Sequence, residues 1–197
     1  ERLGFGTAVP HALRDLGVPQ HYLDTATRTD LPAPDMDLVY AGDMAQLRAF
    51  VPMLHSIHAA GRRLLLIGDV PEDLQVQLPE SVVCTGHVSS HGLPLQLRRA
   101  RYGLNVTSES AHQLSSAAVL AYCAVGLPVV SHDYPWVRYF AAHHQANFLL
   151  LGDDPLGWEK NFGEALAVFP YRVPDVRALA WPLVLDKLGL WKHLLNQ

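Results

Sequence analysis

Six short apolar runs, separated by segments with helical patterning, constrain the fold of this chain more than any other feature of its sequence. They lie between Asp37 and about Ala167 and are rich in Val, Ile and Leu. A continuous apolar run such as RRLLLIGD is typical of a parallel strand covered on both faces. Strands that alternate with helices predict an α/β fold with a Rossmann-like, doubly wound parallel sheet of about six strands and helices on both faces. The expected strands span residues 37–42, 62–69, 81–88, 101–108, 127–133 and 147–153.

The segments between these runs carry start and stop signals of helices. Asp43 is a candidate N-cap for the helix that ends at Gly61, and Gly126 is a candidate C-cap for the helix that carries Tyr122. Pro71 and the two acids after it suit the first turn of another helix. The expected helices span residues 43–61, 71–78, 91–100, 117–126, 134–144 and 154–169.

The alternation stops near both ends of the chain, which divides the sequence into three parts. Residues 1–36 are interpreted as a linker or a remnant of a preceding domain, with one helix expected over residues 10–16. Residues 37–169 form the expected Rossmann-like domain, and residues 170–197 a Pro-containing tail with an amphipathic helix. Because the sequence does not begin with Met, we expect it to start within a longer protein.

Composition and charge narrow the class of protein. With 49% hydrophobic and 17% charged residues the chain is expected to fold compactly, and its net charge of -4 argues against a nucleic-acid partner. Cys84 and Cys123 stand in apolar runs, so we expect two buried free thiols and a reducing compartment. The apolar stretches are too short to cross a bilayer and no signal peptide is recognisable, which favours a cytoplasmic location.

Histidine is the unusual component, with 11 residues scattered along the chain. His55 and His58 alone have a helical i, i+3 spacing, and no acidic residue stands near them at ligand spacing. Surface or internally hydrogen-bonded histidines therefore explain the pattern, and no metal site is expected.

Ligands of an open parallel sheet bind beyond the carboxyl ends of its strands, so the loops after the expected strands are the candidate sites. The sequence holds neither a GxxxxGK[ST] nor a GxGxxG phosphate motif, and no GxSxG. The segment that leads into the helix at Ala117 is the best candidate for an anion, because helix N-termini offer free N–H groups and Ser115 and Ser116 add hydroxyls. Ordinary N-capping by either serine is the alternative.

Acidic residues near the expected strand ends are a second class of candidates. An acid at the start of a helix is most often a cap, which is the simpler interpretation for Asp43 and Asp133. Glu109 lies in a loop instead, and we retain it as a residue that could face a ligand.

Residues 37–135 together resemble the C-terminal, nucleotide-sugar-binding domain of GT-B fold glycosyltransferases. VYAGDM (39–44) is similar to that family's first strand and glycine turn, and LLLIGD (64–69) to its second strand. VVCTGHVSSHGLPLQLRRARYGLNVT (82–107) is similar to its strand, glycine, short helix and next strand. AYCAVGLPVVSHDYP (121–135) resembles the recurrent segment in which a helix ends in Gly-Leu-Pro-Val-Val. The details are most similar to the glucuronosyltransferase of xanthan assembly and related bacterial polysaccharide enzymes.

The resemblance implies a set of donor contacts. Gly42, Asp43 and Met44 would hold the phosphates or the sugar through their backbone, and Ser115 with Ser116 the diphosphate. The turn Gly86, His87 and Val88 would contact the base, and Thr107 would line the floor.

The chain departs from the family at three positions. Many retaining members carry two Glu where this chain has Gln113 and Ala121, and related members carry a Lys at Ala118. The resemblance then implies weaker donor binding unless Arg98, Arg101, His112 or the absent half of the enzyme supplies the missing groups.

The resemblance implies the donor-binding half of a glycosyltransferase that moves a sugar from a nucleotide diphosphate to a glycan, lipid or protein, without a metal. A missing N-terminal GT-B domain would supply acceptor and base, so the isolated domain is expected to be inactive, and that half could attach the enzyme to the inner face of the membrane. A degenerate GT-B domain that serves as a non-catalytic partner-binding or regulatory module is the alternative. A nucleotide-sugar epimerase, with His87 or His112 beside Glu109, is a weaker third.

Overall fold

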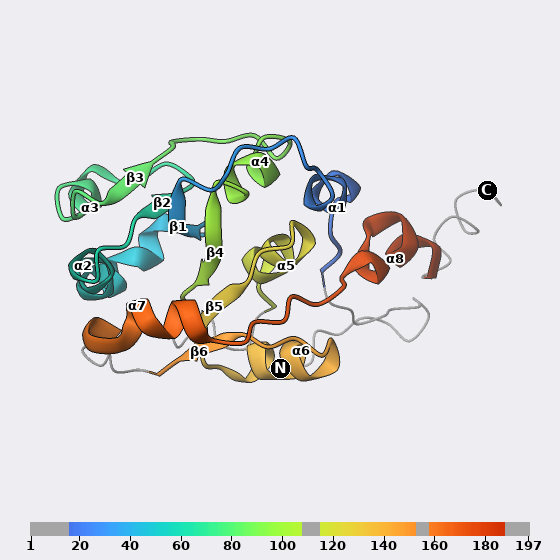
Figure 1. The fold of residues 1–197 in the computed structure, drawn as a ribbon. Helices are drawn as coiled ribbons and strands as arrows, with labels where there is room; N and C mark the ends of the chain where they lie inside the picture. Colours follow the sequence, from blue (N-terminus) through green and yellow to red (C-terminus); the bar gives the residue numbers. More distant parts are fainter. Residues whose placement is uncertain (1–15, 108–114, 153–157, 188–197) are drawn as a thin grey trace, which may run out of the picture.

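The structure, a computed structural model, describes residues 16–107, 115–152 and 158–187. Its sheet contains six parallel strands in the order β3-β2-β1-β4-β5-β6 (Figure 1). The strands are β1 (Met36–Tyr40), β2 (Leu64–Leu66), β3 (Val82–Cys84), β4 (Ala100–Asn105), β5 (Val129–His132) and β6 (Leu149–Leu151). The Rossmann-like, doubly wound α/β fold expected from the sequence is thereby confirmed, although each strand is shorter than its apolar run.

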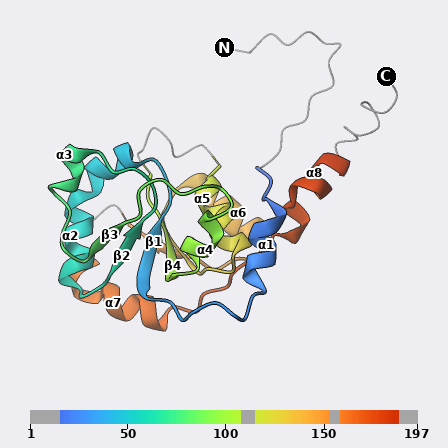
Figure 2. The ribbon, with the colours of Figure 1, turned by 90° about the horizontal axis from the view of Figure 1, so that it is seen from above.

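Eight α-helices accompany the strands in the described residues. They are α1 (Gln20–Ala26), α2 (Val51–Ala59), α3 (Glu72–Gln75), α4 (Leu93–Leu97), α5 (Ala117–Ala124), α6 (Pro135–His143), α7 (Trp158–Val168) and α8 (Trp181–Lys187). Two 3-10 helices, η1 (Met44–Phe50) and η4 (Arg177–Leu179), precede α2 and α8. Figure 2 shows α2 and α7 on one side of the strands and α1, α4 and α5 on the other.

The buried side chains form one core on each face of the sheet. Neighbouring strand residues alternate between the cores, because successive side chains of a strand point to opposite faces. Thus Leu38 and Leu64 belong to the core under α2 and α7, whereas Val39 and Leu65 belong to the core under α1, α4 and α5. All four side chains are fully buried.

The capping signals have their expected roles. The Asp43 carboxylate accepts a hydrogen bond from the backbone of Ala45 and begins η1, which leads into α2. Gly126 follows the C-cap of α5 with a φ of 78°, a left-handed conformation that glycine adopts without strain.

Gly103 has a different requirement, which comes from packing. The ring of Tyr122 on α5 lies directly over this residue of β4. A Cβ at position 103 would come within 2.3 Å of the ring carbon Cγ. The fully buried Tyr122 side chain therefore fits only because the strand has no side chain there.

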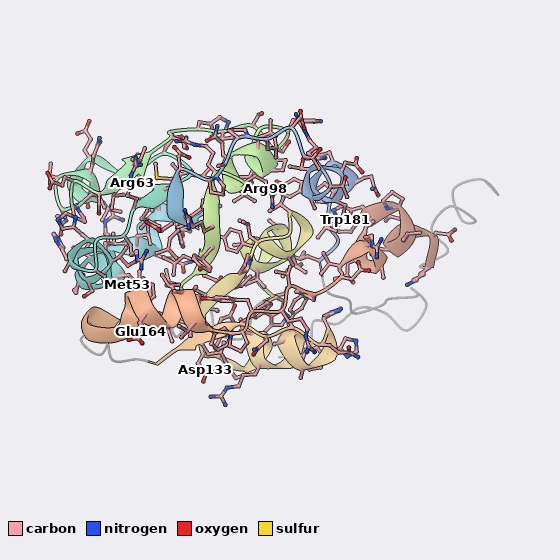
Figure 3. All side chains as sticks on the ribbon, in the orientation of Figure 1. Met53, Arg63, Arg98, Asp133, Glu164 and Trp181 are labelled. Atoms are coloured by element: carbon pink, nitrogen blue, oxygen red, sulfur yellow. The ribbon has the colours of Figure 1, made fainter. Side chains whose placement is uncertain are left out.

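Both ends of the described chain pack on the sheet domain. Val18 forms a bridge with Ala180, and the Trp181 ring lies against Gly17. Figure 3 labels Trp181 beside α1 and α8. Within the described part of the chain, no helix is both long and apolar enough to cross a membrane.

One expectation is corrected. Cys84 is exposed and not buried, because β3 is the edge strand and its last side chain faces outward, whereas Cys123 is buried as expected. The helix expected over residues 10–16 falls outside the described residues apart from Leu16, which is not helical. α1 was not predicted.

Candidate anion-binding site

The strand order reverses between β1 and β4, and a pocket opens at the carboxyl ends of these two strands. β2 and β3 continue the sheet on one side of this point, and β5 and β6 on the other. In doubly wound sheets this switch point leaves a crevice where ligands bind. We call this cavity of about 260 Å³ the anion pocket; its lining comprises Tyr40, Ala41, Gly42, Asp43, Gln46, Asn105, Val106, Thr107, Ser115, Ser116, Ala117, Ala118 and Tyr134.

A network of polar side chains forms the floor of the anion pocket. Asn105, buried at the end of β4, donates from Nδ2 to Ser131 Oγ at 2.8 Å and to the Tyr134 hydroxyl at 3.3 Å. Its Oδ1 accepts a hydrogen bond from Ser116 Oγ at 2.9 Å. Burial raises the pKa of Tyr134, so its hydroxyl is protonated at neutral pH. The network ties β4, β5 and the start of α5 together beneath the pocket.

Two tyrosines hold the backbone on the β1 side. The Tyr122 hydroxyl accepts a hydrogen bond from the Ala41 N–H at 2.9 Å and donates to the Leu104 carbonyl at 3.0 Å. The Tyr40 hydroxyl donates to the Asp43 carbonyl at 3.0 Å. Burial raises the pKa of both tyrosines, so both hydroxyls are neutral donors at physiological pH.

The N-terminus of α5 supplies the hydrogen-bond donors of the pocket. Ser116 is the N-cap, and its Oγ accepts from the Val119 N–H at 3.2 Å while its proton goes to Asn105. No described residue accepts a hydrogen bond from the N–H of Ala117 or Ala118. These two groups carry the partial positive charge of the helix terminus, which favours an anion.

Cationic side chains do not contribute to this pocket in the described residues. Its lining contains no Lys, Arg or His, and its one charged member is the carboxylate of Asp43. Arg98 donates to the Val125 carbonyl at 3.3 Å, at the opposite end of α5 from the pocket. Arg101 is exposed near the start of β4, whereas the pocket borders the end of that strand. Neither arginine therefore lies where it could replace the Glu and Lys side chains that family members use to bind the nucleotide sugar.

Five of the sequence-predicted site residues meet at the anion pocket, although they come from three separate stretches of the chain. They are Gly42, Asp43, Thr107, Ser115 and Ser116. Ser115 is half-buried, and no described residue is its hydrogen-bond partner. Ser116, by contrast, has its proton committed to the floor network.

The remaining predicted residues lie elsewhere. The Met44 side chain is buried in the core beside Gly68 and does not line the pocket. Gly86, His87 and Val88 follow β3, which is separated from β1 by β2. They do not line the anion pocket. Glu109, His112 and Gln113 lie outside the described residues, and with them the pairing with His87 considered for an epimerase.

Sequence reasoning missed the residues that shape the floor. Asn105 and Ser131 are register partners on β4 and β5, and both are buried polar residues. Buried polar side chains are hydrogen-bonded in folded proteins, so two of them in apolar runs were a usable signal. Tyr134 offered no local signal, because its contact depends on how α6 follows β5.

Solved structures with the same fold include glycosyltransferases. AviGT4, a glycosyltransferase involved in avilamycin A biosynthesis, matches with a TM-score of 0.65 and 18% identity over 95% of this chain and 57% of that one. Sucrose-phosphate synthase from Thermosynechococcus elongatus matches with a TM-score of 0.61 and 16% identity over 92% of this chain and 52% of that one.

These likenesses establish the fold. The chain spans a little more than half the length of both proteins, and it resembles them in architecture far more than in sequence. No protein-family model matches the sequence, and a search of curated proteins finds no match.

Proposed function

We propose that this chain is the donor-binding half of a glycosyltransferase and that the anion pocket receives the diphosphate of a nucleotide sugar. The observation that carries the proposal is that Ala117 and Ala118, whose N–H groups have no acceptor among the described residues, line a pocket at the switch point of the sheet. Solved structures of the same fold that are glycosyltransferases support it.

The chemistry of the pocket suits a phosphate held without a metal. Two backbone donors, the Ser115 hydroxyl and the helix terminus provide hydrogen bonds and partial positive charge. A departing nucleoside diphosphate gains negative charge as the bond to the sugar breaks, and donors already in position stabilise that charge. The role of the chain in the reaction would then be to bind the donor and stabilise the leaving group.

The rest of the reaction belongs to a second domain. We infer that acceptor binding and any general base come from an N-terminal GT-B domain, which would form the other wall of the cleft. From the sequence resemblance we also propose a glycan, lipid or protein as the acceptor and a place in bacterial polysaccharide assembly, as in xanthan-type enzymes. We propose a cytoplasmic location as well, with attachment to the inner face of the membrane through the second domain.

A degenerate domain that acts as a partner-binding or regulatory module is the second candidate. Three observations favour it: the described lining has no cationic side chain, alanines occupy positions 118 and 121, and the Ser116 proton is used internally. Such a domain would keep the fold and the pocket without affinity for nucleotides.

Calorimetric titration of the chain with UDP, GDP and dTDP, and with their sugar conjugates, separates the two. The proposal expects saturable 1:1 binding of at least one nucleotide. Ser115→Ala should weaken it about tenfold or more, because a hydrogen bond to a charged group contributes about 1.5–3 kcal/mol. Ser90→Ala, at an exposed serine of the segment after β3, is the matched control and should change nothing. Absence of binding by every nucleotide would favour the non-catalytic module.

A further inference from the structure

A second, apolar pocket adjoins the anion pocket. We call this cavity of about 350 Å³ the apolar pocket; it is lined by Leu16, Gly17, Val18, Pro19, Tyr22, Ala41, Leu93, Ala117, Ala118, Leu120, Ala121 and Trp181. Ala41, Ala117 and Ala118 line both cavities. The two cavities therefore leave room for a ligand with a phosphate at the start of α5 to extend past Ala118 and Ala121 into the apolar pocket.

Three alanines of α5 form a continuous surface that borders both cavities. Ala117, Ala118 and Ala121 stand at i, i+1 and i+4, so they form one surface that begins at the free N–H groups and runs about one turn along the helix. Their methyl groups are the smallest side chains available, which leaves room for a ring to lie against the helix. One turn is about 5.4 Å, comparable to the reach from a phosphate to the sugar ring of a nucleoside.

The apolar pocket offers little to a hydroxyl group. Among the described residues that line it, Tyr22 and Trp181 alone carry polar side-chain atoms, and no carboxylate, amide or aliphatic hydroxyl is present. Each of these two residues has a single polar group. The surface formed by Ala117, Ala118 and Ala121, which we call the α5 wall, has no polar side-chain group. A ribose seated against that wall would lose water from its hydroxyls without gaining a side-chain partner from it, which is unfavourable.

We propose that the apolar pocket receives the nucleoside of the donor and favours a 2′-deoxyribonucleoside diphosphate over the corresponding ribonucleoside diphosphate. The inference rests on the proposed function, because it takes the anion pocket as the seat of the diphosphate. Shape and apolar contact select the nucleoside here, since the α5 wall forms no hydrogen bond with position 2′. A methyl group on the base would bury further apolar surface and strengthen binding.

UDP, dUDP and dTDP separate the effect of the 2′-hydroxyl on affinity from the effect of the base methyl group. UDP and dUDP differ only in the 2′-hydroxyl, and dUDP and dTDP differ only in the methyl group of the base. We expect calorimetry on the wild-type chain to give a dUDP dissociation constant at least about fivefold below that of UDP, as for a hydroxyl buried without a partner. We expect dTDP to bind about threefold tighter than dUDP.

A substitution in the α5 wall tests whether the nucleoside binds in the apolar pocket. Ala121→Gln places an amide where the ribose hydroxyls would lie, so UDP should gain affinity relative to dUDP and the ratio should narrow to about twofold or less. Ala59→Gln, at an exposed position of α2, is the matched control and should leave the ratio unchanged. Melting temperatures of both variants establish that they are folded, and the wild-type comparison stands without either variant.

Each outcome decides something. If UDP binds as tightly as dUDP or tighter, the inference on the nucleoside is overturned while the proposed function stands. If the wild type prefers dUDP but a folded Ala121→Gln keeps the full preference, the nucleoside lies elsewhere and the inference is again overturned. If no nucleotide binds, the proposed function fails together with it.

Discussion

Proline at position 117 would remove one backbone donor from the anion pocket without disturbing the helix that carries it. Ala117 is the first residue of α5 and its side chain is exposed. Proline is well tolerated at this position of a helix, where its missing N–H has no intrahelical partner. The preceding Ser116 already has an extended backbone, with φ -92° and ψ 109°, which is the conformation that a following proline requires.

The expected magnitudes follow from these contacts. Loss of one N–H that binds a phosphate removes about 1.5–3 kcal/mol, so Ala117→Pro should weaken nucleotide binding about 10- to 100-fold. The same change should leave the melting temperature equal to or slightly above that of the wild type, because a compatible proline stabilises a protein by about 0.4–1 kcal/mol through its unfolded state. Weaker binding in a protein of undiminished stability is therefore the expected combination.

Isothermal titration calorimetry measures the nucleotide affinity, and differential scanning calorimetry of the same samples measures the melting temperature. Gln20→Pro is the matched control, since Gln20 is the exposed first residue of α1 and follows the extended Pro19. It introduces the same residue at the same helical position and should leave the affinity unchanged. An Ala117→Pro variant that melts like the wild type and binds nucleotide equally well would refute the assignment of the α5 amides to the diphosphate.

Three further outcomes can be measured by thermal unfolding. Gly103→Ala forces a Cβ into a buried aromatic ring and should lower the melting temperature by about 2–10 °C, whereas Gly152→Ala, with open space around its Cβ, should change it by about 1 °C or less. Ser116→Ala removes an N-cap and should lower it by about 2–4 °C. Hydrogen bonds from Arg177 lower the pKa of Asp175 to about 2. Any stabilisation by this exposed pair is fully present above the unfolded-state pKa of about 3.9 and is lost as pH falls through the folded-state pKa of about 2, so the slight difference in stability between Asp175→Asn and the wild type at pH 7 should shrink at pH 2. A difference that grows on acidification would contradict this sign.

The parts of the fold that were predictable depend on local signals. The run at residues 64–66 is fully buried because both faces of the sheet are covered, and such a strand must be apolar throughout. Gly126 ends α5 because that position is left-handed. α1 lacked a comparable signal: its buried Tyr22 and Thr25 are held by contacts with α4 and α5, which are distant in the sequence.

The site divides in the same way. The amides at the start of α5 and the cap at Ser116 could be predicted, since they depend on where one helix begins. For the floor network the sequence offered only the two polar residues within apolar runs; the contact between Asn105 and Ser131 depends on the register of β4 with β5 and could not be predicted. Met44, for which a backbone contact was expected, has its side chain in the core and is not among the residues that line the pocket.

Tyr122 connects the two strands that border the crevice. Its hydroxyl joins the backbone of Ala41 to that of Leu104, so β1 and β4 cannot part at this edge without breaking one part-buried and one buried hydrogen bond. These hydrogen bonds brace the carboxyl ends of β1 and β4 before any ligand binds. The same packing couples positions 103 and 122: a larger residue at Gly103 becomes acceptable only when Tyr122 is replaced by a smaller residue, and that replacement removes both hydrogen bonds.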